Sequence, residues 1–380
     1  MPKIAIHGFY GAGNLGDEAI LEILLRELNR LKGAKVVVFA WNPEAVSQTY
    51  GVKSLSYAGK TGLMRRIWEI GRSNIFILGG GGLLKDYGKD SSSLRGWLGL
   101  LRLAQRLRIR TALLGVGVEN IRYDESRKLI KEALDNVDLI TVRDHISRDI
   151  LADIGVTNEV KVTTDPAVLY GEVKPGKPAE WSLPPKVLIS VRHWYDKGFY
   201  IDNAEANQNL LRSLGAAADF LIRKYGAEVT FVPFRTTSYD NDIEVMEQVA
   251  SYMKHGDEAC IQSVVPEADD FVKMAGESSL VIGMRLHSLI LASAVGTPVI
   301  GLEYMPKVRG YMDSIGQSKY CLDLNTLTGD KLTACVQDIL ENYTSISSDI
   351  VTRVSQLQRV ARESLKEIFE LGGVGNGKSL

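Results

Sequence analysis

The chain has 380 residues, 45% of them hydrophobic, which is enough for two α/β domains with separate cores. Its 45 basic and 46 acidic residues leave a net charge of -1, which argues against a broad nucleic-acid-binding surface and a nucleic-acid partner. The three cysteines, Cys260, Cys321 and Cys335, are irregularly spaced and predict neither a disulfide framework nor a metal site.

The amino terminus leads directly into a predicted strand over 3–7 instead of a signal sequence. No apolar run approaches the ~20 residues that a bilayer requires, so we expect a cytoplasmic protein. A glycine-rich turn, Gly8–Gly16, follows and precedes a predicted helix over 17–31. The turn lacks the G-x-G-x-x-G spacing, and the next predicted strand, 34–40, ends without an acidic residue to hold a ribose. We therefore expect no dinucleotide cofactor.

Two polar residues of this turn, Asn14 and Asp17, suit hydrogen bonds to the hydroxyl groups of a ligand. Their alternative roles are structural, because Asn14 would take a left-handed turn and Asp17 would cap the helix. A third predicted strand, 74–78, runs into the glycine stretch Gly79, Gly80, Gly81 and Gly82. Consecutive glycines let a ligand approach the backbone closely, or they permit tight packing.

Further along the chain, single cations follow predicted strands. Arg143 follows the strand 138–142, and Arg192 follows the strand 187–191, which opens the second half of the chain. The carboxyl ends of parallel strands form the crevice of a doubly wound sheet, so both arginines are candidates for ligand contact. The alternative for Arg143 is a surface ion pair with Asp144 or Asp149.

The domain division follows from a proline-rich segment, 174–185, which holds four of the chain's eleven prolines and is the best linker candidate. Strands alternate with helices on both sides of it, which predicts the α/β class with a parallel sheet in each half. We expect one domain over 1–175, a second over 186–342, a final helix over 343–371 and a disordered tail over 372–380.

The most informative stretch, 279–309, has the pattern of a βαβ unit. Arg285 and His287 lie at the start of its helix, where backbone N–H groups and the helix dipole favour an anion. Lys307 follows the next strand and is expected at the same rim. A guanidinium, an imidazole and an ammonium together suit a phosphorylated, carboxylated substrate and proton transfer. The alternative is that these residues are helix caps or solvated side chains.

One further motif, Asp240-Asn241-Asp242, has the spacing found in metal-dependent sugar transferases. It precedes a predicted helix in a stretch rich in Thr, Ser and Tyr, so helix capping is the favoured interpretation. No other set of ligands is apparent, and we predict no metal. The P-loop and nucleophile-elbow motifs are also absent.

Taken together, five short motifs occur in the order found in the polysaccharide pyruvyl transferase family, which this chain resembles, most closely its CsaB type. The motifs are Gly13-Asn14-Leu15-Gly16-Asp17, Gly79–Gly82, Arg143-Asp144, Asp165-Pro166, and Arg285-Leu286-His287-Ser288 with Lys307. The resemblance implies a GT-B-like fold, in which two Rossmann-like domains face a cleft and the last helix crosses back to the first domain.

The resemblance also implies an activity, the transfer of the enolpyruvyl part of phosphoenolpyruvate to a sugar as a cyclic ketal. Phosphoenolpyruvate would be a co-substrate, and without a redox change no cofactor is expected. For the CsaB type, the implied acceptor is an N-acetylmannosamine-containing glycan on a lipid diphosphate. The pyruvylated secondary cell wall polymer then anchors surface-layer proteins.

Residue by residue, the resemblance carries donor binding onto Arg285 and His287, and also onto Arg143, Arg192 and Lys307. Fixed cations would stabilise the negative charge that develops on the phosphate as it leaves. We assign catalysis to Arg285 and His287. An imidazole, with an ordinary pKa of about 6.5, exchanges protons near neutral pH. The acceptor role is our own inference and falls on the opposite domain, on Asn14, Asp17, Gly79, Gly80, Gly81 and Gly82.

The sequence also allows two alternative functions, and it predicts one contact with the membrane. A nucleotide-sugar glycosyltransferase would use the cations for a diphosphate and Glu303 for a ribose. A non-catalytic glycan-binding protein is disfavoured, because neutral sugars need neither cations nor a histidine. Peripheral contact with the inner membrane surface is expected through Arg65, Arg66 and Arg95.

Overall fold

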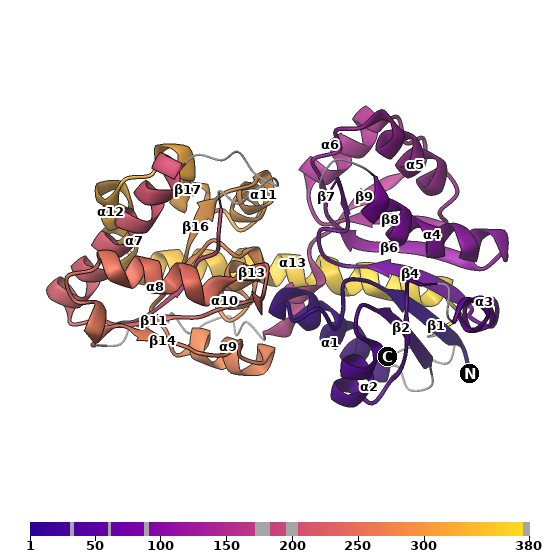
Figure 1. Cartoon of the computed structure of the whole chain (residues 1–380), viewed down its shortest axis with the longest axis horizontal. Helices are drawn as coiled ribbons and strands as arrows, with labels where there is room; N and C mark the ends of the chain where they lie inside the picture. Colours follow the sequence, from indigo (N-terminus) through magenta and orange to yellow (C-terminus); the bar gives the residue numbers. More distant parts are fainter. Residues whose placement is uncertain (31–33, 60–61, 87–90, 172–182, 195–203, 375–380) are drawn as a thin grey trace. The chain divides into compact units, whose positions relative to one another are not determined.

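The computed structural model describes residues 1–30, 34–59, 62–86, 91–171, 183–194 and 204–374. The chain forms two compact units, each a Rossmann-like α/β domain (Figure 1). Unit 1 comprises Met1–Pro166 with Leu357–Leu380, and unit 2 comprises Ala167–Gln356. Most of the predicted linker and residues 375–380 of the predicted tail lie outside the described residues.

Unit 1 is built on a seven-stranded sheet in the order β3-β2-β1-β4-β6-β8-β9, with every neighbouring pair parallel. Its inner strands are short apolar runs that are buried, as a sheet covered on both faces requires. A two-residue pair, β5 (Leu84–Lys85) with β7 (Val118–Glu119), lies outside this sheet. The strands are β1 (Lys3–His7), β2 (Lys35–Ala40), β3 (Lys53–Ser56), β4 (Ile75–Gly79), β6 (Arg110–Val116), β8 (Leu139–Val142) and β9 (Val160–Val162).

Helices connect these strands, and the sequence pattern predicted the longer ones. The edge strand β3 was not predicted, because its residues are only partly buried and form no apolar run. Strand β4, the third predicted strand, is therefore the fourth in the chain. The helices are α1 (Leu15–Arg30), α2 (Pro43–Tyr50), α3 (Leu63–Gly71), α4 (Ser92–Arg106), α5 (Asp124–Leu134) and α6 (His145–Ile154).

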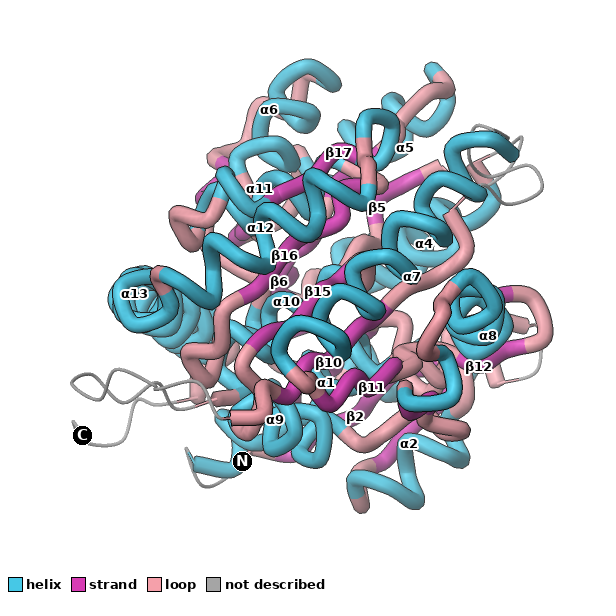
Figure 2. The backbone as a smooth tube through the Cα atoms, turned by 90° about the vertical axis from the view of Figure 1, so that its left-hand side faces the viewer, coloured by secondary structure: helices cyan, strands magenta, loops and turns pink. Residues whose placement is uncertain are grey.

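Unit 2 has a six-stranded parallel sheet in the order β14-β11-β10-β15-β16-β17. Its magenta strands are flanked by cyan helices in Figure 2. Helix α7 packs against α8 and α12, whereas α10 packs against α9 and α11. The strands are β10 (Lys186–Ser190), β11 (Glu228–Phe231), β14 (Cys260–Ile261), β15 (Leu280–Gly283), β16 (Val299–Glu303) and β17 (Cys321–Asp323). The helices are α7 (Ala204–Tyr225), α8 (Asp242–Tyr252), α9 (Ala268–Gly276), α10 (Leu286–Ser293), α11 (Pro306–Ser314) and α12 (Gly329–Glu341), and a short hairpin pairs β12 (Thr236–Thr237) with β13 (Asp240–Asn241).

The last helix, α13 (Tyr343–Leu371), begins in unit 2 and ends in unit 1, as the fold class predicted. In unit 2, Ser347 Oγ donates to the Gly296 carbonyl at 2.8 Å, and in unit 1 Glu367 pairs with Lys161. Residues 372–374, predicted as the start of a disordered tail, instead cap this helix. Val374 is buried, and its N–H donates to the Phe369 carbonyl at 2.9 Å.

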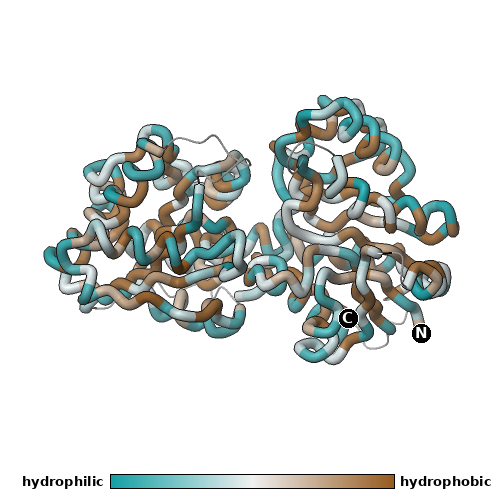
Figure 3. The backbone as a smooth tube through the Cα atoms, viewed as in Figure 1, coloured by the Kyte–Doolittle hydropathy of each residue, from teal (hydrophilic) through white to brown (hydrophobic). Residues whose placement is uncertain are grey.

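In both sheets the order of the strands reverses at one point, and this point decides where a ligand can bind. Numbered within its own unit, each sheet contains the order 3-2-1-4-5-6, so the reversal falls between the first and fourth strands. These are β1 and β4 in unit 1, and β10 and β15 in unit 2. Ligands of doubly wound sheets bind outside the carboxyl ends of the strands at this switch point. In each unit, strands that are mostly brown in Figure 3 lie between helices that carry many teal segments.

Candidate functional site

The predicted cations of unit 2 gather at the carboxyl edge of its sheet. Arg192 follows β10, Arg285 and His287 follow β15, and Lys307 follows β16. The register pairs Ser190 with Gly283 and Gly283 with Gly301, so β10 and β15 end at the same level and β16 runs two residues further. The fold thus brings four residues that are up to 115 positions apart (307 − 192) to the switch-point edge.

The guanidinium of Arg285 turns into the protein and binds two carboxylates. Its Nη2 donates to Asp240 Oδ1 at 2.9 Å and to Asp242 Oδ1 at 2.5 Å, and its Nε donates to Asp242 Oδ2 at 3.1 Å. Burial and the charge of Arg192 act to lower the pKa of Arg285, but the two aspartates outweigh them and raise it. Arg285 is therefore a permanent cation whose fork is engaged by protein carboxylates.

The Asp240-Asn241-Asp242 motif supplies those carboxylates. Asn241 caps α8 by accepting from the Ile243 N–H at 3.2 Å, so the predicted capping is correct for Asn241. Asp242, which is fully buried, binds Arg285 and accepts from the N–H of Phe234 and of Arg235. Among the residues that the structure describes, no group of three or more His, Cys, Asp or Glu could hold a metal ion.

Asp240 joins three arginines into one cluster. Its carboxylate lies 3.5 Å from Arg192 Nη2 and 3.4 Å from Arg235 Nη1, in addition to the contact with Arg285. Burial acts to raise the pKa of Asp240, but the three arginines together lower it below its ordinary value. Three guanidinium groups against two carboxylates leave one net positive charge at the edge of the sheet. We call Arg192, Arg235, Arg285, Asp240 and Asp242 the arginine–aspartate cluster.

A tyrosine that the sequence did not single out links this cluster to Lys307. Tyr304 follows β16, and its ring centroid is 5.4 Å from Arg192 Cζ and 5.1 Å from Lys307 Nζ. Cation–π contacts of this kind hold flexible cations in place. Glu303, the predicted ribose contact of the rival function, instead accepts from Arg309 Nε and Nη2 at 2.9 and 2.7 Å.

His287 is the second residue of α10 and is half-buried. The turn that presents it is tight, because Ser288 Oγ donates to the Arg285 carbonyl at 2.6 Å. A Cβ at Gly283 would lie 2.3 Å from that Oγ, so only glycine fits at the end of β15. The turn therefore directs Arg285 inward to the aspartates and places His287 at the amino end of α10.

In unit 1, Asn14 and Asp17 meet at the amino end of α1. Asn14 Nδ2 donates to Asp17 Oδ2 at 2.6 Å, and Asn14 Oδ1 accepts from the Gly16 N–H at 3.2 Å. The left-handed residues of this turn are Gly11 and Gly13, so the structural alternative proposed for Asn14 is wrong. Asp17 lies inside the helix and is buried, so it is not the cap residue.

The glycine stretch packs directly on these residues. Gly80 and Gly81 have φ values of 63° and 76°, which only glycine adopts readily. A Cβ at Gly80 would lie 2.3 Å from Ile20 Cγ2, and one at Gly81 would lie 2.6 Å from Asp17 Oδ1. The tight-packing alternative thus applies here, and the stretch fixes Asp17 at the switch point.

Arg143 lies in unit 1, whereas the other four predicted donor residues belong to unit 2. Its guanidinium pairs with Glu119 and, at 3.2 Å, with Asp144, while its side chain is only 5% exposed. The predicted pair with Asp144 is therefore present, but it is buried instead of lying at the surface, and Asp149 binds Arg148. Burial acts to lower the pKa of Arg143, but Glu119, Asp144 and Asp165 raise it above its ordinary value.

Two titratable residues near this turn escaped the sequence analysis. Burial, reinforced by the charge of Asp17, raises the pKa of Glu18 from 4.5 to about 7, although the N–H of Gly11 donates to it at 2.7 Å. Burial and the charges of Asp17, Glu18 and Asp165 raise the pKa of Tyr10, whose hydroxyl donates to the Gly79 carbonyl at 2.7 Å. The only sequence signal for Glu18 is its place beside Asp17 in the first turn of α1.

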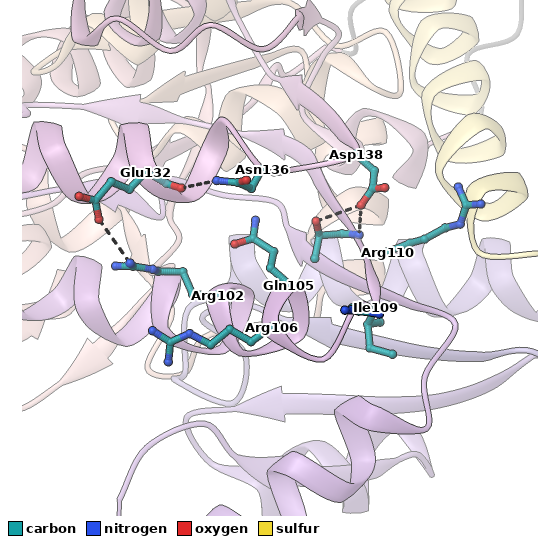
Figure 4. Close-up of a pocket in the computed structure, with 10 residues that line it drawn as sticks. Arg102, Gln105, Arg106, Ile109, Arg110, Glu132, Asn136 and Asp138 are labelled. Atoms are coloured by element: carbon teal, nitrogen blue, oxygen red, sulfur yellow. Dashed lines mark hydrogen bonds and ion pairs between the residues drawn. The ribbon is translucent and has the colours of Figure 1, made fainter.

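An open pocket of about 460 Å³ lies elsewhere in unit 1, at the amino ends of β6 and β8 (Figure 4). Asp138 Oδ2 accepts there from the Thr111 N–H at 2.8 Å, and Glu132 pairs with Arg102 at 3.3 Å. This pocket is at the opposite edge of the sheet from the switch point and is not part of the candidate site. Arg102, Arg106, Arg108 and Arg110 contribute to its lining.

Two doubly wound units in one chain define the GT-B-like class of folds, and solved structures share this fold. MnaA from S. aureus, solved with UDP, has a TM-score of 0.64 at 12% identity, covering 100% of this chain and 99% of that one. A UDP-GlcNAc 2-epimerase from Methanocaldococcus jannaschii has a TM-score of 0.58 at 14% identity, covering 90% of this chain and 93% of that one. A glycosyltransferase from Rickettsia africae ESF-5 has a TM-score of 0.60 at 12% identity, covering 99% of both chains. At these identities the likeness shows the fold alone.

The family follows from the sequence match. The polysaccharide pyruvyl transferase family model matches residues 14–305, so the chain belongs to this family. Amylovoran biosynthesis protein AmsJ of Erwinia amylovora is 34% identical over 77 residues, which is 20% of this chain and 19% of AmsJ. The match thus spans about a fifth of that curated relative.

Proposed function

We propose that this transferase moves the enolpyruvyl group of phosphoenolpyruvate onto two hydroxyl groups of one sugar, forming a cyclic ketal and releasing inorganic phosphate. The first hydroxyl adds to the central carbon of the enolpyruvyl group, and its methylene carbon gains a proton to become a methyl group. The second hydroxyl then displaces phosphate from the same carbon. The second proton leaves with the phosphate, so no redox partner is needed.

The observation that carries this proposal is the cationic edge of unit 2. Arg192 and Lys307 flank Tyr304 at the edge where α10 presents His287. The helix amino end and the net positive charge of the arginine–aspartate cluster favour the phosphate and carboxylate of the donor. In this proposal His287 exchanges the proton with the methylene carbon or the sugar hydroxyl.

Arg285 takes a different part in the proposal from that of Arg192 and Lys307. It binds Asp240, which also contacts Arg192, so Arg285 orients the donor-binding arginine through a shared carboxylate. Arg143 remains a donor-binding residue by family resemblance alone, since Glu119 and Asp144 engage it.

We further propose that the acceptor binds to unit 1 and that the protein is of the CsaB type. Asn14 and Asp17 offer an amide and a carboxylate for sugar hydroxyl groups, beside the glycine stretch 79–82. The acceptor would be an N-acetylmannosamine-containing glycan on a lipid diphosphate, made on the cytoplasmic side of the membrane for surface-layer anchoring. Among the described residues, no helix is long and apolar enough to cross a bilayer.

A direct experiment separates this function from nucleotide-sugar transfer. The protein is titrated with phosphoenolpyruvate and with UDP by calorimetry, and the product is examined by NMR for a ketal methyl group. We expect phosphoenolpyruvate to bind, the ketal to form and activity to survive EDTA. Binding of UDP without phosphoenolpyruvate would overturn the proposal. Loss of activity on chelation, restored by Mg²⁺, would return the Asp240-Asn241-Asp242 motif to a metal-binding role.

A further inference from the structure

Helix α3 exposes three large apolar residues on the outside of unit 1, although Ile70 of the same helix is buried in the core. Met64 is 76% exposed, Trp68 61% and Leu63 48%, whereas Arg66 and Glu69 on the same helix are 5% and 6% exposed. A surface helix ordinarily turns its apolar face to the core and its charged face to water. Helix α3 departs from this pattern, because Leu63, Met64 and Trp68 face water while two of its charged residues are buried.

Buried polar contacts fix this orientation. Glu69 pairs with Lys3 and, at 2.6 Å, with Lys53, which are the first residues of β1 and β3. Arg66 donates to the carbonyls of Ser56 and Ala58 at 3.3 and 3.0 Å. Turning the helix over would leave these buried charges unpaired, which costs more than exposing the apolar residues. The buried contacts of Arg66 and Glu69 therefore keep the apolar side chains of α3 exposed in the folded protein.

Two of the three arginines predicted to reach the membrane are engaged by other groups of the protein. Arg66 is buried, and Arg95, although exposed, pairs with Glu125 at 2.6 Å. Arg65 is exposed and forms no ion pair among the described residues. A further set of residues is therefore needed for a membrane contact.

The end of α4 supplies that set. Leu107, 36% exposed, lies against the end of α3, where a Cβ at Gly71 would be 3.8 Å from its Cδ1. Arg106 and Arg108 flank Leu107 in the chain and are exposed, and the guanidinium of Arg72 lies 4.9 Å from the Trp68 ring. In the part of the chain that the structure describes, no carboxylate pairs with Arg65, Arg72, Arg106 or Arg108. The docking face comprises these four arginines with Leu63, Met64, Trp68 and Leu107.

We infer that the docking face binds the surface of a lipid bilayer that contains anionic lipids. Leucine, methionine and tryptophan side chains insert at the boundary between headgroups and acyl chains, and arginines around them bind lipid phosphates. The chain as a whole has a net charge of -1, so this gathering of unpaired cations is local. A second copy of the chain fits poorly, because a symmetric contact would set the same arginines against each other.

The docking face leaves the candidate acceptor site accessible. Lys3 and Lys53, which hold α3, are at the amino ends of their strands, whereas Asn14 and Gly79–Gly82 follow the carboxyl ends of β1 and β4. Binding at one edge of the sheet therefore does not cover the other. The inference stands on the exposed residues of α3 and α4 and does not depend on the proposed reaction.

Cosedimentation with vesicles of phosphatidylcholine, with and without phosphatidylglycerol, tests this inference. We expect the full chain to bind vesicles that contain phosphatidylglycerol, and rising salt to weaken binding. The double variant Met64→Ser/Trp68→Ser should bind at least about tenfold less tightly. Arg65→Glu/Arg72→Glu should lose at least about 25-fold, since each cation near such a surface contributes about fivefold. The matched controls, Val264→Ser and Arg223→Glu on exposed positions of unit 2, should bind like the wild type.

Three results would overturn the inference. They are equal binding of the variants and the wild type, equal binding to both kinds of vesicle, and no binding to either. A dimer in size-exclusion chromatography that dissociates in Met64→Ser/Trp68→Ser would make the face a contact between copies instead. Unchanged thermal unfolding shows that each variant is folded, and phosphate release with a water-soluble acceptor reports on the reaction separately.

Discussion

The two switch points of this protein have the same strand order and opposite chemistry. In unit 2 the edge holds Arg192, Arg235, Arg285 and Lys307, balanced in part by two aspartates. In unit 1, Asp17 and Glu18 lie at the start of α1 near Tyr10, and Arg143, which follows β8, lies among the carboxylates of Glu119, Asp144 and Asp165. The fold fixes where a ligand binds, but the residues that follow each strand decide which ligand the site accepts.

The two sites also differ in how their charges respond to pH. The guanidinium groups of unit 2 stay charged throughout the physiological range, and the aspartates raise the pKa of Arg285 further. In unit 1 the pKa of Glu18 is about 7, so its charge changes near neutral pH. A permanent cationic edge suits an anionic donor, whereas a titratable, hydrogen-bonding edge suits a neutral glycan hydroxyl.

The largest effect is expected when the imidazole of His287 is removed from the switch point of unit 2. His287→Ala should lower ketal formation by roughly 10² to 10⁴, because a general acid–base group acts in the transition state. The donor dissociation constant from calorimetry should change by less than about tenfold. His255→Ala, on an exposed histidine of the same unit that pairs with Glu258, is the control. Near wild-type turnover in His287→Ala would remove this residue from the mechanism.

The buried aspartate of the cluster should matter most for stability. Asp242→Asn removes a fully buried carboxylate and leaves Arg285 short of a counter-charge, which should lower the free energy of unfolding by about 3 to 5 kcal/mol. Thermal unfolding should show a fall of about 10 °C or more in the melting temperature of unit 2. Asp257→Asn, at an exposed position, should leave it unchanged. A stable Asp242→Asn variant would mean that Asp240 alone holds the three arginines.

The division of donor and acceptor between the units is tested from the unit 1 side. Asn14→Ala should raise the acceptor KM by about tenfold, the value of one hydrogen bond to a polar partner, and leave phosphoenolpyruvate binding unchanged. Asp17→Ala should do the same, with an added loss of stability, because Asp17 is buried and bonded to Asn14. If either variant weakens phosphoenolpyruvate binding as strongly as Arg192→Ala does, the assignment of the units is reversed.

The smallest effect concerns the pH dependence of unit 1. The folded-state pKa of Glu18 is raised from 4.5 to about 7, so the folded protein holds this proton more tightly than the unfolded chain. Stability is therefore lost as pH rises from about 4.5 to about 7. Glu18→Gln removes the titrating group, so its melting temperature relative to the wild type should be a few degrees higher at pH 8 than at pH 5. An equal difference at both pH values would show that Glu18 is not perturbed.

The sequence by itself determined the α/β class, the repeated Rossmann-like pattern and the last helix. Strands β1 and β15 begin and end where their apolar runs do, because a buried parallel strand must be apolar on both faces. The same local logic put Arg192, Arg285, His287 and Lys307 after strands, and parallel strands end at one edge. Helix α3 was not predicted, because three of its apolar residues face outward and its placement depends on the contacts of Glu69 with Lys3 and Lys53.

Only the tertiary structure decided what each charged residue does. Arg285 and Asp242 are 43 positions apart, and Arg143 and Glu119 are 24 apart, so no local pattern relates them. Burial of an arginine requires a counter-charge, but which carboxylate supplies it depends on how separate βα units pack. The sequence therefore determined which residues reach the switch points. Long-range packing decided that Arg285 faces aspartates, that Arg143 is buried against Glu119 and Gly117, and that Glu18 titrates near neutral pH.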